Sequence, residues 1–412
     1  MLTQGVVSLD FRTRTDADVR PIDPVVFFEH DLVELAERNG ELAVPGAREL
    51  RVRPFTIEVD GTCWTLSLVD DRIDITRGEA AESHVRLDAE GLTDLVHDIR
   101  TPMGFFTGGD LDMPRGRLED FLDWWVVLRS LLDERRAHTA GAIDFRDPAG
   151  DPLDLTRTFA PDDPDEEMAH FLSEAGFLHI GGLFSEAEMA AVSADIDAAL
   201  PAYEPDDGRS WWAHTASGEH RAVRLQYFQE HSDTTTAILG DDRYLRIGRL
   251  TDDGYVSGEA RRGANVIEAL VKPIGIVDGI SDLPWHKDCS LGRHSYRCCG
   301  ITVGISVTGA DASSGQLRVV AGSHRALIQP AFVRRRLDLP QIDLPTSTGD
   351  ITVHLSCTLH MSQAPTAQER RVMYTGFGLP DPDGLARAGQ DKINRIREGS
   401  YKTVSQPPAA VR

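Results

Sequence analysis

The chain has 412 residues, of which 41% are apolar and 26% charged, and its 66 acidic and 43 basic side chains give a net charge of −23. This composition is that of an ordinary soluble globular chain, and its length predicts two or three domains. The negative charge repels polyanions, so we expect no nucleic-acid partner, and no apolar run approaches the ~18 residues that cross a bilayer.

The cysteines and the start of the chain bear on its compartment. The first residues lack the apolar centre of a secretory signal, and the five cysteines are odd in number and lack Cys-x-x-Cys spacing. Both features argue against a disulfide framework, and the cysteine spacing also argues against a zinc ribbon. We therefore expect a cytoplasmic protein with reduced thiols, in which a few specific cations hold any anionic cosubstrate. The oligomeric state does not follow from the sequence.

A helix followed by an antiparallel sheet is predicted first along the chain. Apolar residues in FFEHDLVELAERNG (27–40) recur at helical spacing, and the closing Gly40 is a typical helix stop. In residues 55–76 apolar and polar side chains alternate around Asp60-Gly61, a dipeptide that favours a two-residue hairpin turn.

A buried helix is expected over residues 116–133, where apolar side chains are dense. We therefore predict an α+β domain over residues 1–145. In HVRLDAEGLTDLVHDIRTPMGFFTGGDLDMPRGRLEDFLDWW (84–125) a strand, a helix, a Gly-Asp turn and a last helix follow one another. This order resembles the sterol-carrier-protein-2-like fold, and the resemblance implies a hydrophobic pocket in this domain.

A linker and two capped helices come next. Residues 146–165 are dense in Pro and Asp, which is typical of an interdomain connector. Asp163 and Pro164 predict the start of a helix that ends at Gly176. The segment Ser185-Glu186-Ala187-Glu188 is a capping box that opens a second helix.

The remainder of the chain predicts mostly short strands and loops. Five strand-like segments, VIEALVKPIGIV, RCCGITVGISVTG, GQLRVVAGSH, DITVHLS and RRVMYTGF, favour an antiparallel sandwich or barrel. Cys298-Cys299 is interpreted as packing within one of these strands. SWWAHTASGEHRAVRLQYF (210–228) gathers aromatic and histidine side chains on a predicted loop, which suits either a substrate lid or an ordinary surface loop.

The stretch PWHKDC (284–289) contains two candidate metal ligands, His286 and Asp288. A mononuclear iron site of the redox type needs two imidazoles and one carboxylate, with the opposite positions open for cosubstrate and dioxygen. Residues two apart on an extended segment point the same way, so this pair can supply two ligands. His231-Ser232-Asp233 has the same spacing, so the tripeptide alone is not specific. His354 and His360 are the candidates for the third ligand.

Several segments, taken in order, resemble the phytanoyl-CoA dioxygenase-like branch of the iron(II)/2-oxoglutarate oxygenases. They are FLSEAGFLHIGGLFSEAEMAAVSADIDAAL, VKPIG followed by PWHKD, SGQLRVVAGSHR, GDITVHLSCTLHMS and ERRVMYTGF, and they span roughly residues 166–380. The resemblance implies a double-stranded β-helix, the cupin-like jelly roll, with flanking helices over residues 166–412. It also implies Fe(II), 2-oxoglutarate and O2 as cofactor and cosubstrates.

The resemblance also selects among the candidate site residues. The distal histidine of the family lies near the end of the segment that begins Gly-Asp, which selects His360 and leaves His354 where a buried apolar residue is usual. The implied metal-binding and catalytic residues are therefore His286, Asp288 and His360. Arg371 follows His360 by the separation that the family shows for the arginine that binds the far carboxylate of 2-oxoglutarate, a role suited to its planar fork.

Predictions for three further side chains, Lys272, Arg370 and His324, complete the site. Lys272 either contacts the cosubstrate or lines the sheet. Arg370 lies on the strand face opposite Arg371 and is expected to be solvated. His324, in a Gly-Ser-His turn, is expected to hold that turn, since the family's iron uses three protein ligands.

The implied function is oxidation of an unactivated C–H bond in a small hydrophobic metabolite, with release of succinate and CO2 and a role in natural-product biosynthesis. Asp288 favours hydroxylation, desaturation or cyclisation over halogenation, because related halogenases have a small apolar residue at this place. The alternative is a catalytically silent small-molecule or lipid carrier with a cupin-like barrel. The substrate and the carbon attacked do not follow from the sequence.

Overall fold

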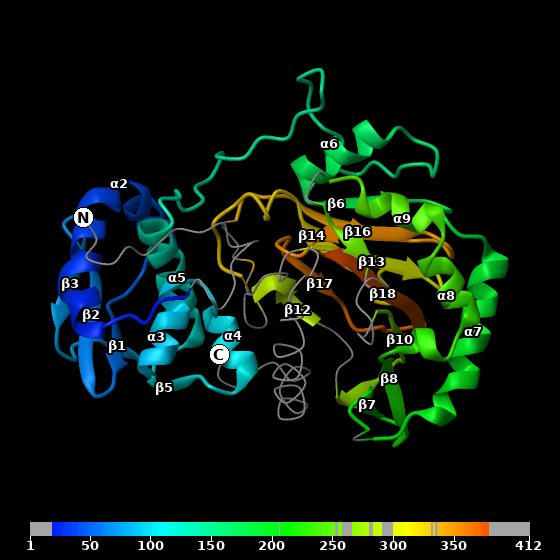
Figure 1. Cartoon of the computed structure of the whole chain (residues 1–412), viewed down its shortest axis with the longest axis horizontal. Coiled ribbons are helices and arrows are strands. Elements are labelled where there is room, and N and C mark those ends of the chain that lie inside the picture. Colours follow the sequence, from blue (N-terminus) through cyan, green and yellow to red (C-terminus); the bar gives the residue numbers. More distant parts are fainter. Residues whose placement is uncertain are drawn as a thin grey trace.

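The computed structural model describes residues 19–205, 207–251, 254–257, 266–279, 283–290, 300–330, 333 and 337–378. These residues form an amino-terminal unit (19–132) and a carboxy-terminal unit (165–378), and residues 133–164 run from one to the other along the top of the view in Figure 1. Within the described ranges, no helix is both long enough and apolar enough to cross a membrane. The expectation for Cys298-Cys299 lies outside the described residues.

The amino-terminal unit packs helices against a five-stranded sheet of order β3-β2-β1-β4-β5. Its elements are α1 (Pro24–Val26), the π-helical η2 (Phe27–Asp31), α2 (Leu32–Leu50), β1 (Phe55–Val59), β2 (Thr62–Val69), β3 (Arg72–Arg77), β4 (Ser83–Leu87), α3 (Ala89–Val96), α4 (Pro102–Gly108), β5 (Asp112–Arg115) and α5 (Leu118–Leu132). The predicted hairpin is confirmed: β1 and β2 pair antiparallel around Asp60 and Gly61, both at positive φ. The sheet is mixed, because β1 pairs parallel with β4.

The first helix is longer than the sequence predicts. Gly40 lies inside α2, which continues to Leu50 and ends where Arg51 adopts a left-handed conformation with φ of 53°. The helix continues because Ala43, Val44 and Ala47 extend its buried face beyond the glycine. Tertiary packing therefore outweighs the local stop signal.

Two antiparallel sheets dominate the carboxy-terminal unit. The larger has the order β11-β7-β8-β10-β18-β13-β16-β6 with β9 beside β18, and the smaller has the order β12-β17-β14-β15. The strands are β6 (Phe177–Ile180), β7 (Ser210–Thr215), β8 (His220–Leu225), β9 (Val256–Ser257), β10 (Glu268–Lys272), β11 (Ile276–Asp278), β12 (Leu283–His286), β13 (Gly300–Ser306), β14 (Leu317–Val320), β15 (Gln341–Leu344), β16 (Ile351–Leu355), β17 (His360–Ser362) and β18 (Arg370–Gly378).

Helices cover one face of the larger sheet, with α7, α8 and α9 on the right and α6 at the top in Figure 1. They are α6 (Asp165–Ala175), α7 (Glu186–Ala199), α8 (Asp233–Leu239) and α9 (Asp242–Gly248), with short 3-10 turns η3 (Leu200–Ala202), η4 (Phe228–Glu230) and η6 (Asp288–Ser290) between elements. Two predicted caps are confirmed: Gly176 ends α6, one residue after Ala175, and Ser185 with Glu188 opens α7 as a capping box. The start of α6 is one residue later than predicted, because Pro164 and not Asp163 is its N-cap. Residues 210–228 are largely the paired strands β7 and β8, so the loop prediction is wrong there.

The two faces of the larger sheet differ in chemistry. Val303, Val353 and Met373 pack in the core that also contains apolar side chains of α7 and α8. On the opposite face, Lys272 of β10 reaches Ser362 of β17, which places the smaller sheet across an interior from the larger one. Polar side chains of both sheets therefore meet between the sheets, away from the helices.

The two units are joined by buried contacts. Leu327 of the carboxy-terminal unit belongs to the hydrophobic core of the amino-terminal unit. Thr101, the N-cap of α4, accepts a hydrogen bond from the amide of Gly104 (3.1 Å) and donates one to the carbonyl of Ser290 (2.8 Å). Ser290 lies two residues after Asp288, so the amino-terminal unit contacts the segment that carries a predicted metal ligand.

We expect Thr101→Val to destabilise the protein, because the change preserves the side-chain shape but removes a cap and leaves a buried carbonyl unpaired. The free energy of unfolding should fall by about 1–3 kcal/mol, measured by urea denaturation. Thr107→Val, on the same helix, removes a side-chain hydrogen bond to the carbonyl of Met103 one turn earlier but leaves the cap in place, and is the matched control. Equal losses in the two variants would contradict the assigned role of Thr101.

Candidate functional site

The pairing of β12 with β17 brings two predicted ligands together. His286, the last residue of β12, lies directly opposite His360, the first residue of β17, and their ring centroids are 4.2 Å apart. Asp288 follows on η6. Ligand atoms of His286, Asp288 and His360 all lie within 4.8 Å of one another. The structure therefore brings these three side chains to one place, between the two sheets.

Both imidazoles direct the same nitrogen, Nε2, to the point where the three side chains meet. Nδ1 of His286 lies 2.7 Å from the carbonyl oxygen of Pro284, and Nδ1 of His360 lies 2.9 Å from that of Thr358. A carbonyl only accepts, so each Nδ1 carries a proton and donates, which leaves Nε2 as the ring nitrogen that can bind a metal. The two Nε2 atoms lie 3.4 and 3.5 Å from Oδ1 of Asp288. Such backbone hydrogen bonds fix the orientation of histidines that bind metals.

The charge states of the cluster also suit a metal. Burial alone would raise the pKa of Asp288, but the nearby imidazoles of His360, His286 and His354 hold it well below its ordinary value. Burial, together with the neighbouring imidazoles, holds the pKa of His360 well below its ordinary value, although Asp288 opposes this. Asp288 is therefore an anion and His360 is neutral, the forms in which these side chains bind metal ions.

His354 lies beside this cluster. Its side chain is 1% exposed, its ring centroid is 4.1 Å from that of His360, and its Nε2 lies 3.4 Å from Oδ2 of Asp288. The sequence predicted a buried residue at this position, and the structure places a buried imidazole there. Thr302, which the sequence analysis missed, donates from Oγ1 to the same Oδ2 at 3.0 Å.

Two buried cations lie along the same interior. Lys272 and Arg370 are directly opposite each other on β10 and β18 and are both buried. Lys272 donates to Oγ of Ser362, two residues beyond His360 on β17. Arg370 donates from Nη1 to the carbonyl of Gly315 at 2.7 Å, while its buried Nε has no hydrogen-bond partner among the described residues. The prediction that Arg370 is solvated is therefore wrong.

Arg371 points away from the cluster. Its Nη2 lies 2.8 Å from Oδ1 of Asp197 and its Nη1 donates to Oγ of Ser193 at 2.9 Å, and both partners lie on α7, on the helix side of the sheet. Successive strand residues face opposite sides, so a shift of one residue exchanges the interior side chain for the outer one. The sequence predicted Arg371 as the arginine that binds the far carboxylate of 2-oxoglutarate, but the structure places Arg370, not Arg371, in the interior.

The other histidine candidates lie elsewhere. His324 places Nε2 2.9 Å from the carbonyl of Ser173, and burial lowers its pKa to about 4. In the second His-x-Asp segment, Ser232 is the N-cap of α8 and Asp233 is the first residue of that helix. The structure does not bring either segment into the cluster around Asp288.

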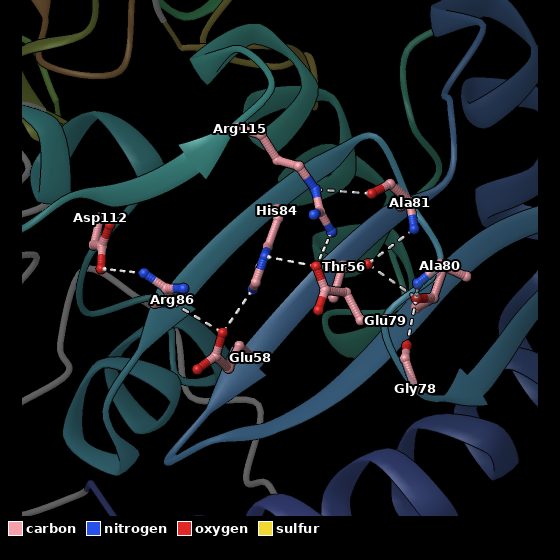
Figure 2. Close-up of polar contacts among 11 residues, drawn as sticks. Thr56, Glu58, Gly78, Glu79, Ala80, Ala81, His84, Arg86, Asp112 and Arg115 are labelled. Carbon is pink, nitrogen blue, oxygen red and sulfur yellow. Dashed lines mark hydrogen bonds and ion pairs between the residues drawn. The ribbon is translucent and has the colours of Figure 1, made fainter.

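A second group of potential ligands, Glu58, Cys63 and His84, lies on the amino-terminal sheet. Figure 2 shows Glu58 and His84 of this group, with Arg86 beside them. Here Oε2 of Glu58 accepts from Nε of Arg86 at 3.0 Å and lies 2.9 Å from Nε2 of His84. Burial raises the pKa of the Cys63 thiol, which disfavours the thiolate that binds metals. A guanidinium beside the carboxylate repels a cation, so we interpret this group as an ion-pair network.

The cluster around Asp288 has the donor set of one particular kind of metal site. Two neutral imidazoles and one carboxylate, with further positions open, are the ligands of non-haem Fe(II) oxygenases. The unpartnered Nε of buried Arg370 is a donor that a bound carboxylate would satisfy. The residues present therefore fit both Fe(II) and a dicarboxylate cosubstrate.

One protein family matches the part of the chain that carries this donor set. The family model described as phytanoyl-CoA dioxygenase (PhyH) matches residues 172–373. No curated protein sequence matches the chain. Similar solved structures include the α-ketoglutarate-dependent epimerase SnoN from nogalamycin biosynthesis (19% identity, 52% of this chain and 82% of that chain, TM-score 0.41). Others are AviO1 from Streptomyces viridochromogenes Tue57 (19%, 52% and 94%, 0.40) and EctD from S. alaskensis (14%, 59% and 85%, 0.42).

The match begins in α6 and ends in β18, so it includes both sheets, the three clustered ligands and the two interior cations. Its members use Fe(II) and 2-oxoglutarate, for which the donor set around Asp288 is suited. Residues 172–373 therefore form a domain of the phytanoyl-CoA dioxygenase (PhyH) family of Fe(II)/2-oxoglutarate-dependent enzymes.

Proposed function

We propose that the protein is an Fe(II)/2-oxoglutarate-dependent oxygenase that oxidises an unactivated C–H bond of a small hydrophobic metabolite and releases succinate and CO2. The observation that carries this proposal is the convergence of Nε2 of His286 and Nε2 of His360 on Oδ1 of Asp288, at 3.4 and 3.5 Å. The match of residues 172–373 to the phytanoyl-CoA dioxygenase family supports it.

In this proposal His286, Asp288 and His360 hold Fe(II) on one side, which leaves the other positions open for the cosubstrate and dioxygen. The bound metal would supply activation of dioxygen coupled to oxidative decarboxylation of 2-oxoglutarate. The chain supplies the orientation of the ligands: backbone carbonyls of Pro284 and Thr358 fix both imidazoles, and the sheets exclude water around them.

The far carboxylate of 2-oxoglutarate is assigned to Arg370 in place of Arg371. Arg370 is 2% exposed, faces the interior and has no carboxylate partner among the described residues. Its planar guanidinium suits two parallel hydrogen bonds to a carboxylate. Lys272, directly opposite on β10, and Ser362 on the ligand strand β17 lie at the same end of the interior and add further donors.

The domain architecture is part of the same proposal. The two sheets would form a double-stranded β-helix in a domain of residues 166–412, after a linker of residues 146–165. The α+β domain of residues 1–145 would have a sterol-carrier-protein-2-like fold and contribute to handling an apolar substrate. Hydroxylation is the favoured reaction, since Asp288 occupies the place that related halogenases leave to a small residue, and natural-product biosynthesis is the favoured setting.

A different class of function is a silent carrier of small molecules or lipids. The convergence of His286, Asp288 and His360, whose ligand atoms all lie within 4.8 Å of one another, argues against it, because a carrier needs no such set of metal ligands. A screen of hydrophobic metabolites separates the two: the oxygenase should release succinate in a substrate-dependent manner under air with Fe(II) and 2-oxoglutarate. A carrier would bind such compounds without any succinate release.

The first test of the metal site is spectroscopic. Fe(II) and 2-oxoglutarate added without oxygen should give a weak visible charge-transfer band, and His286→Ala should lose it. The loss of one ligand should weaken Fe(II) binding by more than about 100-fold, since changes beyond the ligands already cost about 10–100-fold. His30→Ala removes an exposed histidine of η2 and should leave the band intact. A band that survives in His286→Ala would exclude this residue as a ligand.

The adjacent arginines provide a matched test of the cosubstrate site. Arg370→Leu should raise the dissociation constant for 2-oxoglutarate at least about 30-fold, because breaking a buried charge pair costs about 2–5 kcal/mol. Arg371→Leu should change it little and should instead lower the free energy of unfolding, because Arg371 ties β18 to α7. Titration of the charge-transfer band measures the first quantity and urea denaturation the second. The reverse pattern would restore the assignment to Arg371.

A further inference from the structure

We propose that Thr302 and His354 act as positioning residues that hold the outer carboxylate oxygen of Asp288, so that Asp288 binds the metal through Oδ1 alone. This inference rests on the proposed function, since it concerns the same metal centre. It assigns a role to two side chains that are outside the predicted ligand set and that come from the central strands β13 and β16.

The two oxygens of Asp288 have different surroundings. Oδ1 faces Nε2 of His286 and Nε2 of His360, at 3.4 and 3.5 Å, and is the oxygen on the metal side. Oδ2 lies 3.0 Å from Oγ1 of Thr302, which donates to it, and 3.4 Å from Nε2 of His354. Two ligand nitrogens therefore share one oxygen, and two potential hydrogen-bond donors share the other.

The two donors come from a rigid part of the fold. Thr302 and His354 are directly opposite each other in the antiparallel pair β13–β16, so their side chains leave the same face of the sheet. Both strands are flanked by other strands, β18 on one side and β6 on the other. Asp288, in contrast, lies on the short 3-10 turn η6, whose own backbone fixes its side chain less firmly.

Apart from its approach to Asp288, the side chain of His354 has no polar role that the described residues show. It is 1% exposed, and neither of its ring nitrogens has a hydrogen-bond partner among the described residues. Burial of an unpaired polar ring is unfavourable, and Oδ2 of Asp288 is an acceptor that a small movement of either side chain would bring into hydrogen-bond range. A buried imidazole with no hydrogen-bond partner among the described residues, 3.4 Å from Oδ2 of Asp288, therefore indicates a role at the metal centre.

The way in which Asp288 binds the metal would determine how many coordination positions stay open. A carboxylate can bind a cation through one oxygen or through both. If both oxygens of Asp288 bound the metal, they would occupy a position that the cosubstrate or dioxygen needs. The hydrogen bond from Thr302, and the one that His354 would form after a small movement, would keep Oδ2 away from the metal and fix the direction of Oδ1.

The test compares variants that remove each donor with variants that keep it. Thr302→Val and His354→Phe remove the donors with similar shapes, whereas Thr302→Ser and His354→Gln retain a hydroxyl and an N–H. The removing variants should weaken Fe(II) binding to the apoprotein about 10-fold or more, measured by competition with a chelator, and should change the visible absorption of the Co(II)-loaded protein. The retaining variants should stay within about 3-fold of the wild type, a smaller change than loss of a metal ligand's support.

Two controls separate this effect from a general loss of structure. His84→Gln replaces a buried histidine in the amino-terminal unit and should leave Fe(II) affinity and the Co(II) spectrum unchanged. Circular dichroism and thermal unfolding of the apoproteins identify any variant that fails to fold, and for such a variant the retaining substitution at the same position decides the outcome.

Three results would overturn the inference. If Thr302→Val and His354→Phe bind Fe(II) like the wild type with unchanged Co(II) spectra, the two residues do not position Asp288, although the proposed function stands. If only His354→Phe loses affinity and Thr302→Val does not, His354 is itself a ligand. If the wild type binds no Fe(II), the proposed function fails and the positioning role fails with it.

Discussion

The antiparallel pairing of β12 with β17 is the contact on which the candidate site depends. It places His286 opposite His360 and, through the turn η6, brings Asp288 beside both imidazoles. The backbone carbonyls of the same segments accept from each Nδ1 and so direct both Nε2 atoms to one point. If this pairing shifted by one residue, the two imidazoles would point to opposite faces and the three ligands would no longer converge.

The alternation of side chains along the larger sheet decides what else reaches the interior. In this strongly acidic chain, with its net charge of −23, two cations, Lys272 and Arg370, are buried side by side at one end of that interior. Burial of a cation is costly unless an anion or several acceptors receive it. The proposed 2-oxoglutarate site explains why these charges are placed where the ligand strand β17 passes.

The amino-terminal unit contacts the segment that carries Asp288. Thr101 caps α4 and at the same time donates to the carbonyl of Ser290, two residues after Asp288. Leu327 and Ala137 join the core of the amino-terminal unit, from the carboxy-terminal unit and the connecting segment respectively. The turn that carries Asp288 is therefore supported from one side by the amino-terminal unit and from the other by Thr302, so both units contribute to the proposed metal centre.

Local signals in the sequence determined the hairpin at Asp60-Gly61 and the capping box at Ser185, because each depends on residues close together in the chain. The preference for His360 over His354 came from the resemblance to a known family, which is carried by the order of segments along the chain. Local signals did not predict the end of the first helix, because packing of its buried face continues α2 past Gly40. The choice between Arg370 and Arg371 also needed the tertiary structure, because register between distant strands decides which side chain faces inward. For the same reason only the paired strands β13 and β16 could place Thr302 and His354 against Asp288.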